Sequence, residues 1–314
     1  CRAPQRRLLT VNTIRPSDFG SFWYELGKEL ADIPASPEIE AIPMRSTDFA
    51  DLYGVRITSI GPYRLYGFLS IPKSDSPVPA IYYAPKNSSV LEIIPQGTSN
   101  AIRGRYITFS LACRGMRNSD KPYAAMYPGQ LTDGIHDSEA YVYRGIVADT
   151  MRGLDFLMSR PEVDRNAVAA WGNDNALLAA ALHDSVTHVV ATPAYLMNTI
   201  EMAERTSAYP LEEFNDYIRH FPEQRDQVEN VLNYYNLKWH AQSITATTLV
   251  MADHESGLYS SQSLSSLVEG ISGEATVHES ERSSFLDGLF AEKWITENLI
   301  GEDADPIVPA HWNE

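Results

Sequence analysis

Residues 168–182 read VAAWGNDNALLAAAL, and this stretch decides how the fold is interpreted. An apolar run ends at Gly172, three polar residues follow, and a run of alanines and leucines comes next. Short apolar runs are typical of buried strands, whereas alanine and leucine favour helices. The stretch therefore predicts a buried strand that turns sharply into a helix, with Asp174 at the corner.

The flanking segments predict a mixed α/β architecture. Residues 51–73 alternate around a Gly-Pro turn, which is typical of an antiparallel hairpin. Beyond the hairpin, short apolar runs alternate with helical patterns, which implies a mostly parallel sheet covered on both faces. Residues 199–240 are helical and interrupt this alternation. We expect one α/β domain over residues 16–305, a helical insertion at about 199–240, and an N-terminal arm at residues 1–15.

Composition excludes several classes of protein. The chain has 314 residues and a net charge of −16, with an isoelectric point near 4.9. Such acidity argues against binding to nucleic acid or to anionic membrane surfaces. No stretch of about 18 uninterrupted apolar residues is present to span a membrane. Two cysteines are too few for a disulfide framework.

Cys1 opens the sequence and precedes a basic segment, residues 2–16, with four arginines and no acid. Two interpretations stay open. Cys1 marks a cleavage boundary, or it is the lipidated first residue of a mature bacterial lipoprotein. The second interpretation places the protein in the bacterial periplasm or at the cell surface, anchored only through Cys1. Its arginines would then face anionic headgroups.

Three motifs carry a family resemblance: GPYRLYGFLSIPK at residues 61–73, DSEAYVYRGIVADTMRGLDFL at residues 137–157, and YPLEEFNDYIRHF at residues 209–221. With them, nearly the whole chain resembles the acetyl xylan esterase / cephalosporin C deacetylase family of α/β-hydrolases. The resemblance implies the α/β-hydrolase fold and hydrolysis of acetyl esters on carbohydrates by a serine, a histidine and an acid, without a cofactor. It also implies assembly into closed oligomers.

The sequence departs from the family around the expected nucleophile. The resemblance places the family serine on Asp174, and the neighbour whose backbone N–H helps to form the oxyanion hole on Asn175. The loop that supplies the other oxyanion donor ends on Asn87, and the last residue of an Arg-Gly-Gln motif is replaced by Met116. The nucleophile itself is therefore missing from this sequence.

The other two catalytic positions depart as well. The loop of the catalytic acid falls on MADHESG, where Asp253 or Glu255 stands in, with His254 between them. The family's final His-Glu pair falls on Ser283 and its neighbour, so the catalytic histidine is also missing. Losing such a serine or histidine costs on the order of 10⁶ in turnover. We therefore expect no catalytic residues, and a protein that is a non-catalytic binding or structural component of the bacterial envelope.

Two alternatives stay open. One is an active carbohydrate esterase of the acetyl xylan type, with its site elsewhere than the resemblance places it. The other is an Asp174-dependent hydrolase, since some α/β-hydrolases use an aspartate nucleophile, and His254 or His278 would then have to activate water. Asp174 and the acid loop could also converge on a metal, but no spacing forms a recognised metal motif. We therefore expect neither metal nor cofactor.

Partners are weakly constrained by the sequence. Self-association, binding to envelope proteins and binding of a carbohydrate all stay open. A carbohydrate is included because Tyr123 and Tyr127 could line a sugar pocket. Tyrosines more often serve packing. At the corner itself, the simpler interpretation is that Asp174 and Asn175 satisfy backbone groups at a tight turn and helix N-terminus.

Overall fold

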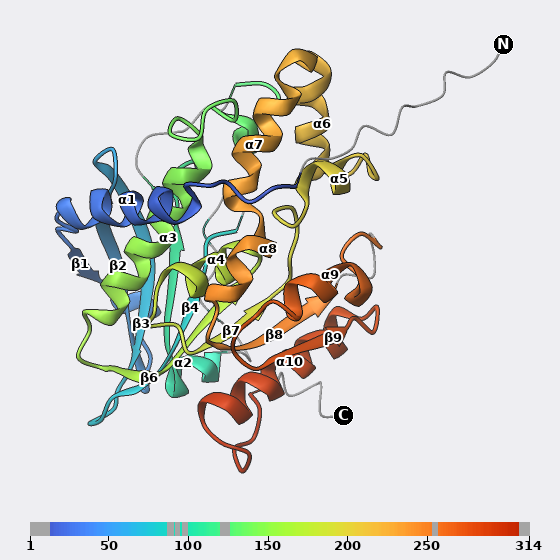
Figure 1. Ribbon diagram of the computed structural model, residues 1–314. Helices are drawn as coiled ribbons and strands as arrows, with labels where there is room; N and C mark the ends of the chain where they lie inside the picture. Colours follow the sequence, from blue (N-terminus) through green and yellow to red (C-terminus); the bar gives the residue numbers. More distant parts are fainter. Residues whose placement is uncertain are drawn as a thin grey trace.

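The computed structural model describes residues 13–86, 91, 95, 100–119, 126–252 and 257–307. Across these residues, nine strands form one sheet in the order β1-β2-β3-β5-β4-β6-β7-β8-β9 (Figure 1). The strands are β1 (Glu38–Ala41), β2 (Ala50–Ser59), β3 (Tyr63–Pro72), β4 (Val78–Tyr83), β5 (Ile107–Ala112), β6 (Val163–Gly172), β7 (His188–Ala191), β8 (Thr247–Ala252) and β9 (Ala275–Glu279). The helices are α1 (Phe19–Asp32), α2 (Ile102–Arg105), α3 (Val142–Met158), α4 (Asp174–Leu182), α5 (Thr199–Ala203), α6 (Leu211–His220), α7 (Arg225–Tyr235), α8 (Leu237–His240), α9 (Ser261–Val268) and α10 (Ser284–Leu299).

The strands β4 to β9 run parallel, whereas β1, β2 and β3 form an antiparallel extension of the sheet. The predicted N-terminal hairpin is confirmed as β2 and β3, and Gly61 takes a left-handed φ of +68° in its turn. Glycine suits this position because it has no Cβ to clash there. The strand β1 was not predicted, because its four exposed residues, Glu-Ile-Glu-Ala, form too short a run to be told from a loop by pattern alone.

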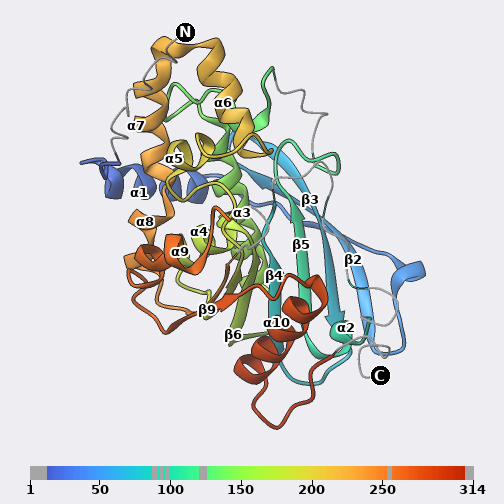
Figure 2. The same cartoon turned by 90° about the vertical axis from the view of Figure 1, so that its right-hand side faces the viewer.

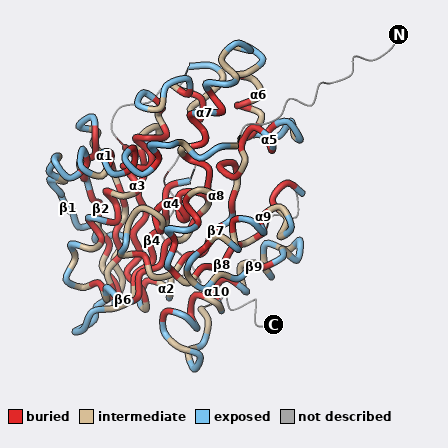
Figure 3. Tube along the Cα trace, in the orientation of Figure 1, coloured by how far each residue is buried: buried red, intermediate tan, exposed pale blue. Residues whose placement is uncertain are grey.

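Helices cover both faces of the sheet, as the sequence predicts. Figure 2 shows α1, α3 and α4 on one face and α10 on the other. The buried side chains accordingly form a large cluster on the α3 and α4 side and a smaller one under α10. Figure 3 shows this burial concentrated along the central strands and in α4. The α/β-hydrolase fold, with its mostly parallel sheet, is therefore confirmed.

The helices α5 to α8 lie between β7 and β8 in the chain, which confirms a helical insertion into the fold. The two longest of them, α6 and α7, form one end of the molecule (Figure 1). None of the helices within the described ranges is both long enough and apolar enough to cross a membrane.

The insertion packs against α1 through a buried histidine, His240, at the end of α8. Its ring lies 4.9 Å from the Phe19 ring and 5.2 Å from the Trp23 ring, and its Nε2–H donates to the Tyr234 carbonyl at 2.9 Å. Burial lowers the pKa of His240 to about 4. The folded protein therefore holds His240 neutral at pH values where the unfolded chain protonates it.

This burial predicts acid sensitivity. As pH falls from about 6.5 towards about 4, protonation of the unfolded chain should reduce the free energy of unfolding by about 2–3 kcal/mol. The substitution His240→Gln keeps an N–H donor but cannot titrate, so it should remove that part of the pH dependence. Urea denaturation at several pH values measures the effect, with the exposed His220→Gln as the control. An unchanged pH dependence in His240→Gln would contradict the prediction.

Candidate functional site

The predicted strand–turn–helix is present at the corner. The strand β6 ends at Gly172, Asn173 is the N-cap of α4, and its side-chain oxygen accepts from the Asn175 N–H at 3.4 Å. A hydrolase elbow instead holds its nucleophile in a strained turn. Among the described non-glycine residues, a positive φ occurs at Ser36, Asn198 and Arg282, so Asp174 does not adopt such a conformation. The corner is a relaxed helix start.

The Asp174 carboxylate is enclosed and bound to the backbone. Its side chain has no exposed surface and accepts from the N–H groups of Ala194 at 3.1 Å, Tyr195 at 3.3 Å and Leu196 at 2.9 Å. Burial raises the pKa of Asp174, while these three N–H donors act to lower it. Asp174 therefore holds the loop that follows β7, and its oxygens face backbone amides.

The expectation that Asp174 and Asn175 satisfy backbone groups at the turn is correct in kind but wrong in detail. Asn173 caps the helix, whereas Asp174 binds a loop about twenty residues further along the chain. The side chain of Asn175 donates to the Pro85 carbonyl at 2.7 Å and accepts from the Tyr143 hydroxyl at 2.8 Å. These partners belong to other elements because the corner is packed between β4, α3 and the β7 loop.

Two buried tyrosines close the space next to Asn175. The hydroxyls of Tyr143 and Tyr195 lie 2.9 Å apart, and burial raises the pKa of both phenols above their ordinary value. Both hydroxyls therefore stay protonated and act as donors in this network. The remaining cavity, which Met116 also lines, has a volume of about 10 Å³. That is room for about one water molecule and too little for an acetyl group.

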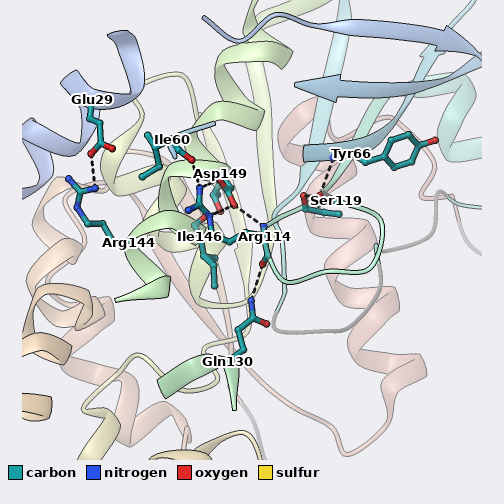
Figure 4. A network of polar contacts seen from close by, with 11 residues as sticks. Glu29, Ile60, Tyr66, Arg114, Ser119, Gln130, Arg144, Ile146 and Asp149 are labelled. Carbon is teal, nitrogen blue, oxygen red and sulfur yellow. Dashed lines mark hydrogen bonds and ion pairs between the residues drawn. The ribbon is translucent and has the colours of Figure 1, made fainter. Parts of the chain in front are cut away.

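Arg114, the first residue of the Arg-Gly-Met motif, has a structural role (Figure 4). Its Nε and Nη2 donate to the two oxygens of the Asp149 carboxylate at 2.9 and 2.8 Å, and its backbone N–H donates at 2.8 Å. Nη2 also donates to the Ile60 carbonyl at 3.0 Å. Gly115 follows with a φ of +87°, where a Cβ would overlap the Gln130 amide. The motif thus fixes the end of β5 against α3.

Two further predicted positions that the structure describes, Ser283 and His278, have partners other than Asp174. Ser283 is the N-cap of α10, and its hydroxyl accepts from the Leu286 N–H at 3.3 Å. His278 lies within β9, as predicted, and its Nε2 contacts the Asp287 carboxylate on α10 at 2.9 Å. The α10 helix covers the face of the sheet opposite α4 (Figure 2), so His278 cannot serve Asp174.

Several predicted positions lie outside the described residues: Cys1, Asn87, Tyr123, Asp253, His254 and Glu255. In the part of the chain that the structure describes, no three His, Cys, Asp or Glu residues are grouped so that they could hold a metal ion. No histidine with described coordinates hydrogen-bonds the Asp174 carboxylate; the bonds it accepts come from backbone amides.

Sequence reasoning missed three residues of this site: Tyr143, Tyr195 and Asp149. Tyr143 and Asp149 stand within the motif at residues 137–157 that carries the family resemblance, so their place in that motif was the available signal. Tyr195 follows β7 with no local pattern that marks it. Its role arises from contacts with Tyr143, 52 residues away in the chain.

Comparison with known proteins gives a consistent result. A sequence model of the family described as acetyl xylan esterase matches residues 9–255. A curated relative, the acetyl esterase Axe7A of Xylanibacter ruminicola, is 24% identical over 256 residues. The match covers 77% of this chain and 57% of the relative, so the chain spans little more than half of that protein's length.

Two solved structures share the fold. Acetyl xylan esterase 1 from Thermoanaerobacterium sp. JW/SL YS485 aligns with a TM-score of 0.81 at 20% identity, covering 92% of this chain and 96% of that one. The acetyl xylan esterase from Paenibacillus sp. R4 aligns with a TM-score of 0.75 at 21% identity, covering 86% and 89%. At this level of identity, the likeness extends to the fold alone.

Proposed function

Because this chain belongs to the acetyl xylan esterase family, we propose that it is a member that has kept the esterase fold and lost serine-dependent hydrolysis. In this proposal it acts by binding, as a non-catalytic component of the cell envelope. The observation that carries the proposal is the burial and hydrogen bonding of the Asp174 side chain. The residue at the nucleophile position is buried, and three backbone N–H groups bind its oxygens.

The chemistry of ester hydrolysis supports this proposal. Acyl transfer in this fold needs an exposed nucleophile, a base beside it and a space for the substrate carbonyl next to the oxyanion donors. Asp174 is enclosed, and the space beside Asn175 holds about one water because Tyr143 and Tyr195 fill it. A carboxylate that already accepts three hydrogen bonds is also a weaker nucleophile, because attack would require it to give up those bonds.

A second candidate function is active ester hydrolysis, and membership of the family favours it. The curated relative is named an acetyl esterase, and the family consists of carboxylic ester hydrolases. This candidate requires a nucleophile other than Asp174. It therefore differs from the first proposal in a property that can be measured directly, the covalent reaction of a serine with a fluorophosphonate.

We expect no turnover of p-nitrophenyl acetate or acetylated xylo-oligosaccharides above the uncatalysed rate. An enzyme with an intact triad would hydrolyse these substrates faster than this protein by a factor on the order of 10⁶. A fluorophosphonate probe should leave the mass of the protein unchanged, and an active acetyl xylan esterase assayed in parallel is the positive control. Turnover that is lost in Asp174→Asn, while the variant unfolds in urea with the same cooperative transition as the parent protein, would establish an aspartate-dependent hydrolase. Labelling of a serine would identify an active site elsewhere, and either result would overturn the proposal.

A further inference from the structure

A second cavity lies beyond the carboxyl ends of β7 and β8. Its volume is about 200 Å³, whereas the cavity beside Asn175 has a volume of about 10 Å³. Its walls come from the loop after β7, the chain that leads into α6, and the chain that leads into α9. Pro193, Ala194, Leu211 and Tyr259 are among the lining residues. In open α/β sheets, ligands bind at this edge, outside the carboxyl ends of the strands. The cavity therefore lies where α/β folds commonly bind their ligands.

The walls favour a neutral ligand. The lining residues that the structure describes are prolines, alanines, leucines, tyrosines and threonines, and none of these carries a charged side chain. A charged ligand would lose hydration there without gaining an ionic partner. Anions are disfavoured further by the net charge of −16.

An exposed aromatic ring stands at the edge of this cavity. Tyr209 lines it with 64% of its surface exposed, and its hydroxyl donates to the Asp216 carboxylate at 2.6 Å. The Tyr127 hydroxyl also bonds Asp216, and Arg219 forms an ion pair with the same carboxylate. Asp216 thus holds the hydroxyl of Tyr209 in place from outside the cavity. A ring that is exposed and fixed in this way is a stacking surface for a planar ligand.

Another wall of the cavity is held in place by Asp174. Ala194, which lines the cavity, donates its backbone N–H to that carboxylate at 3.1 Å. The two following residues do the same, so the loop cannot shift without breaking three hydrogen bonds to a buried carboxylate. The residue that replaces the family nucleophile therefore gives the cavity a rigid wall, which lowers the cost of ordering on binding.

We propose that this cavity binds a small neutral molecule with one aromatic ring, which packs between Tyr209 and the apolar wall formed by Pro193 and Tyr259. A sugar ring fits less well, because hydroxyls surround its rim and each needs a partner. The walls offer few polar groups, and Thr206 Oγ1 already accepts from the Ala208 N–H at 3.0 Å. The inference rests on the proposed binding role and names its ligand class.

Isothermal titration with 4-hydroxyacetophenone tests this proposal. The molecule is neutral, has a single ring and contains no ester, so binding is measured independently of any turnover. We expect a Kd of about 0.1–1 mM, the range that ligands of about ten heavy atoms reach. The anionic 4-hydroxybenzoate and methyl β-D-xylopyranoside should each bind at least about tenfold more weakly. If the protein binds 4-hydroxyacetophenone but also hydrolyses esters, only the proposed function is overturned. If it neither binds this molecule nor hydrolyses esters, only this inference is overturned.

Two variants locate the ligand. Ala208→Trp fills the cavity from an exposed position, and Tyr209→Ala removes the stacking ring; each should weaken binding about tenfold or more. Tyr209→Phe keeps the ring and should bind within about threefold of the parent protein. Tyr24→Ala, on α1, is the matched control, because Tyr24 is 67% exposed and lies outside the cavity lining. Unchanged affinity in both Ala208→Trp and Tyr209→Ala, or equal affinity for the xyloside, would overturn the proposal.

Discussion

Replacing Asp174 with alanine should lower the free energy of unfolding by about 3–5 kcal/mol, an effect near the upper limit for single substitutions. The reason is the number of donors that depend on this side chain. The N–H groups of Ala194, Tyr195 and Leu196 all point at one buried carboxylate. A buried N–H without an acceptor costs about 1–3 kcal/mol, and removing the carboxylate leaves three N–H groups without their acceptor.

Equilibrium urea denaturation measures the loss, with Asp184→Ala as the control. Asp184 is exposed and follows α4, so its removal should change stability by less than about 0.5 kcal/mol. Formate is small enough to occupy the vacated position and accept from the same N–H groups. It should restore part of the stability of Asp174→Ala and leave the parent protein unaffected. A loss below about 1 kcal/mol would show that the loop does not depend on this carboxylate.

Asp149→Ala should destabilise the protein to a similar extent, by about 3–5 kcal/mol. The Asp149 carboxylate is fully buried and accepts three hydrogen bonds from Arg114, two of them from the guanidinium (Figure 4). Removing the acid leaves the guanidinium, whose side chain is 14% exposed, without its counter-charge. The end of β5 would also lose its attachment to α3, because both residues join these elements.

A double-mutant cycle separates the ion pair from the packing. If Asp149→Ala and Arg114→Met are combined, the loss should be smaller than the sum of the two single losses, because the partner charge is then removed as well. Glu25→Ala is the contrasting control, since the Glu25–Lys28 pair on α1 has the same chemistry with side chains 60% and 55% exposed. That substitution should cost less than about 0.5 kcal/mol. Additive losses from Asp149→Ala and Arg114→Met would show that the pair is not coupled.

These two carboxylates both have a structural role in the fold. Asp149 belongs to the motif at residues 137–157 that carries the resemblance, and it joins the end of β5 to α3 through Arg114. Asp174, the position to which the resemblance assigns the family nucleophile, stabilises the loop after β7.

The sequence by itself determined the order and kind of the main elements, because these follow from local periodicity. The five apolar residues of α1 at helical spacing, Phe19, Phe22, Trp23, Leu26 and Leu30, are the five that the structure buries. The alternation in β2 and β3 and the apolar run of β6 likewise appear as strands in the expected positions. The motifs at residues 61–73, 137–157 and 209–221 were enough to indicate the α/β-hydrolase fold.

Tertiary structure alone decided what the residues of the site do. Asp174 was identified from sequence as an important position, but its partners are backbone amides, which every non-proline residue carries and no pattern distinguishes. The pairs Arg114–Asp149 and Tyr143–Tyr195 join residues 35 and 52 positions apart. The larger cavity requires three segments, at residues 192–194, 206–211 and 258–259, to meet at one edge of the sheet. Local patterns report which face of an element is buried; which groups meet there depends on how the whole chain packs.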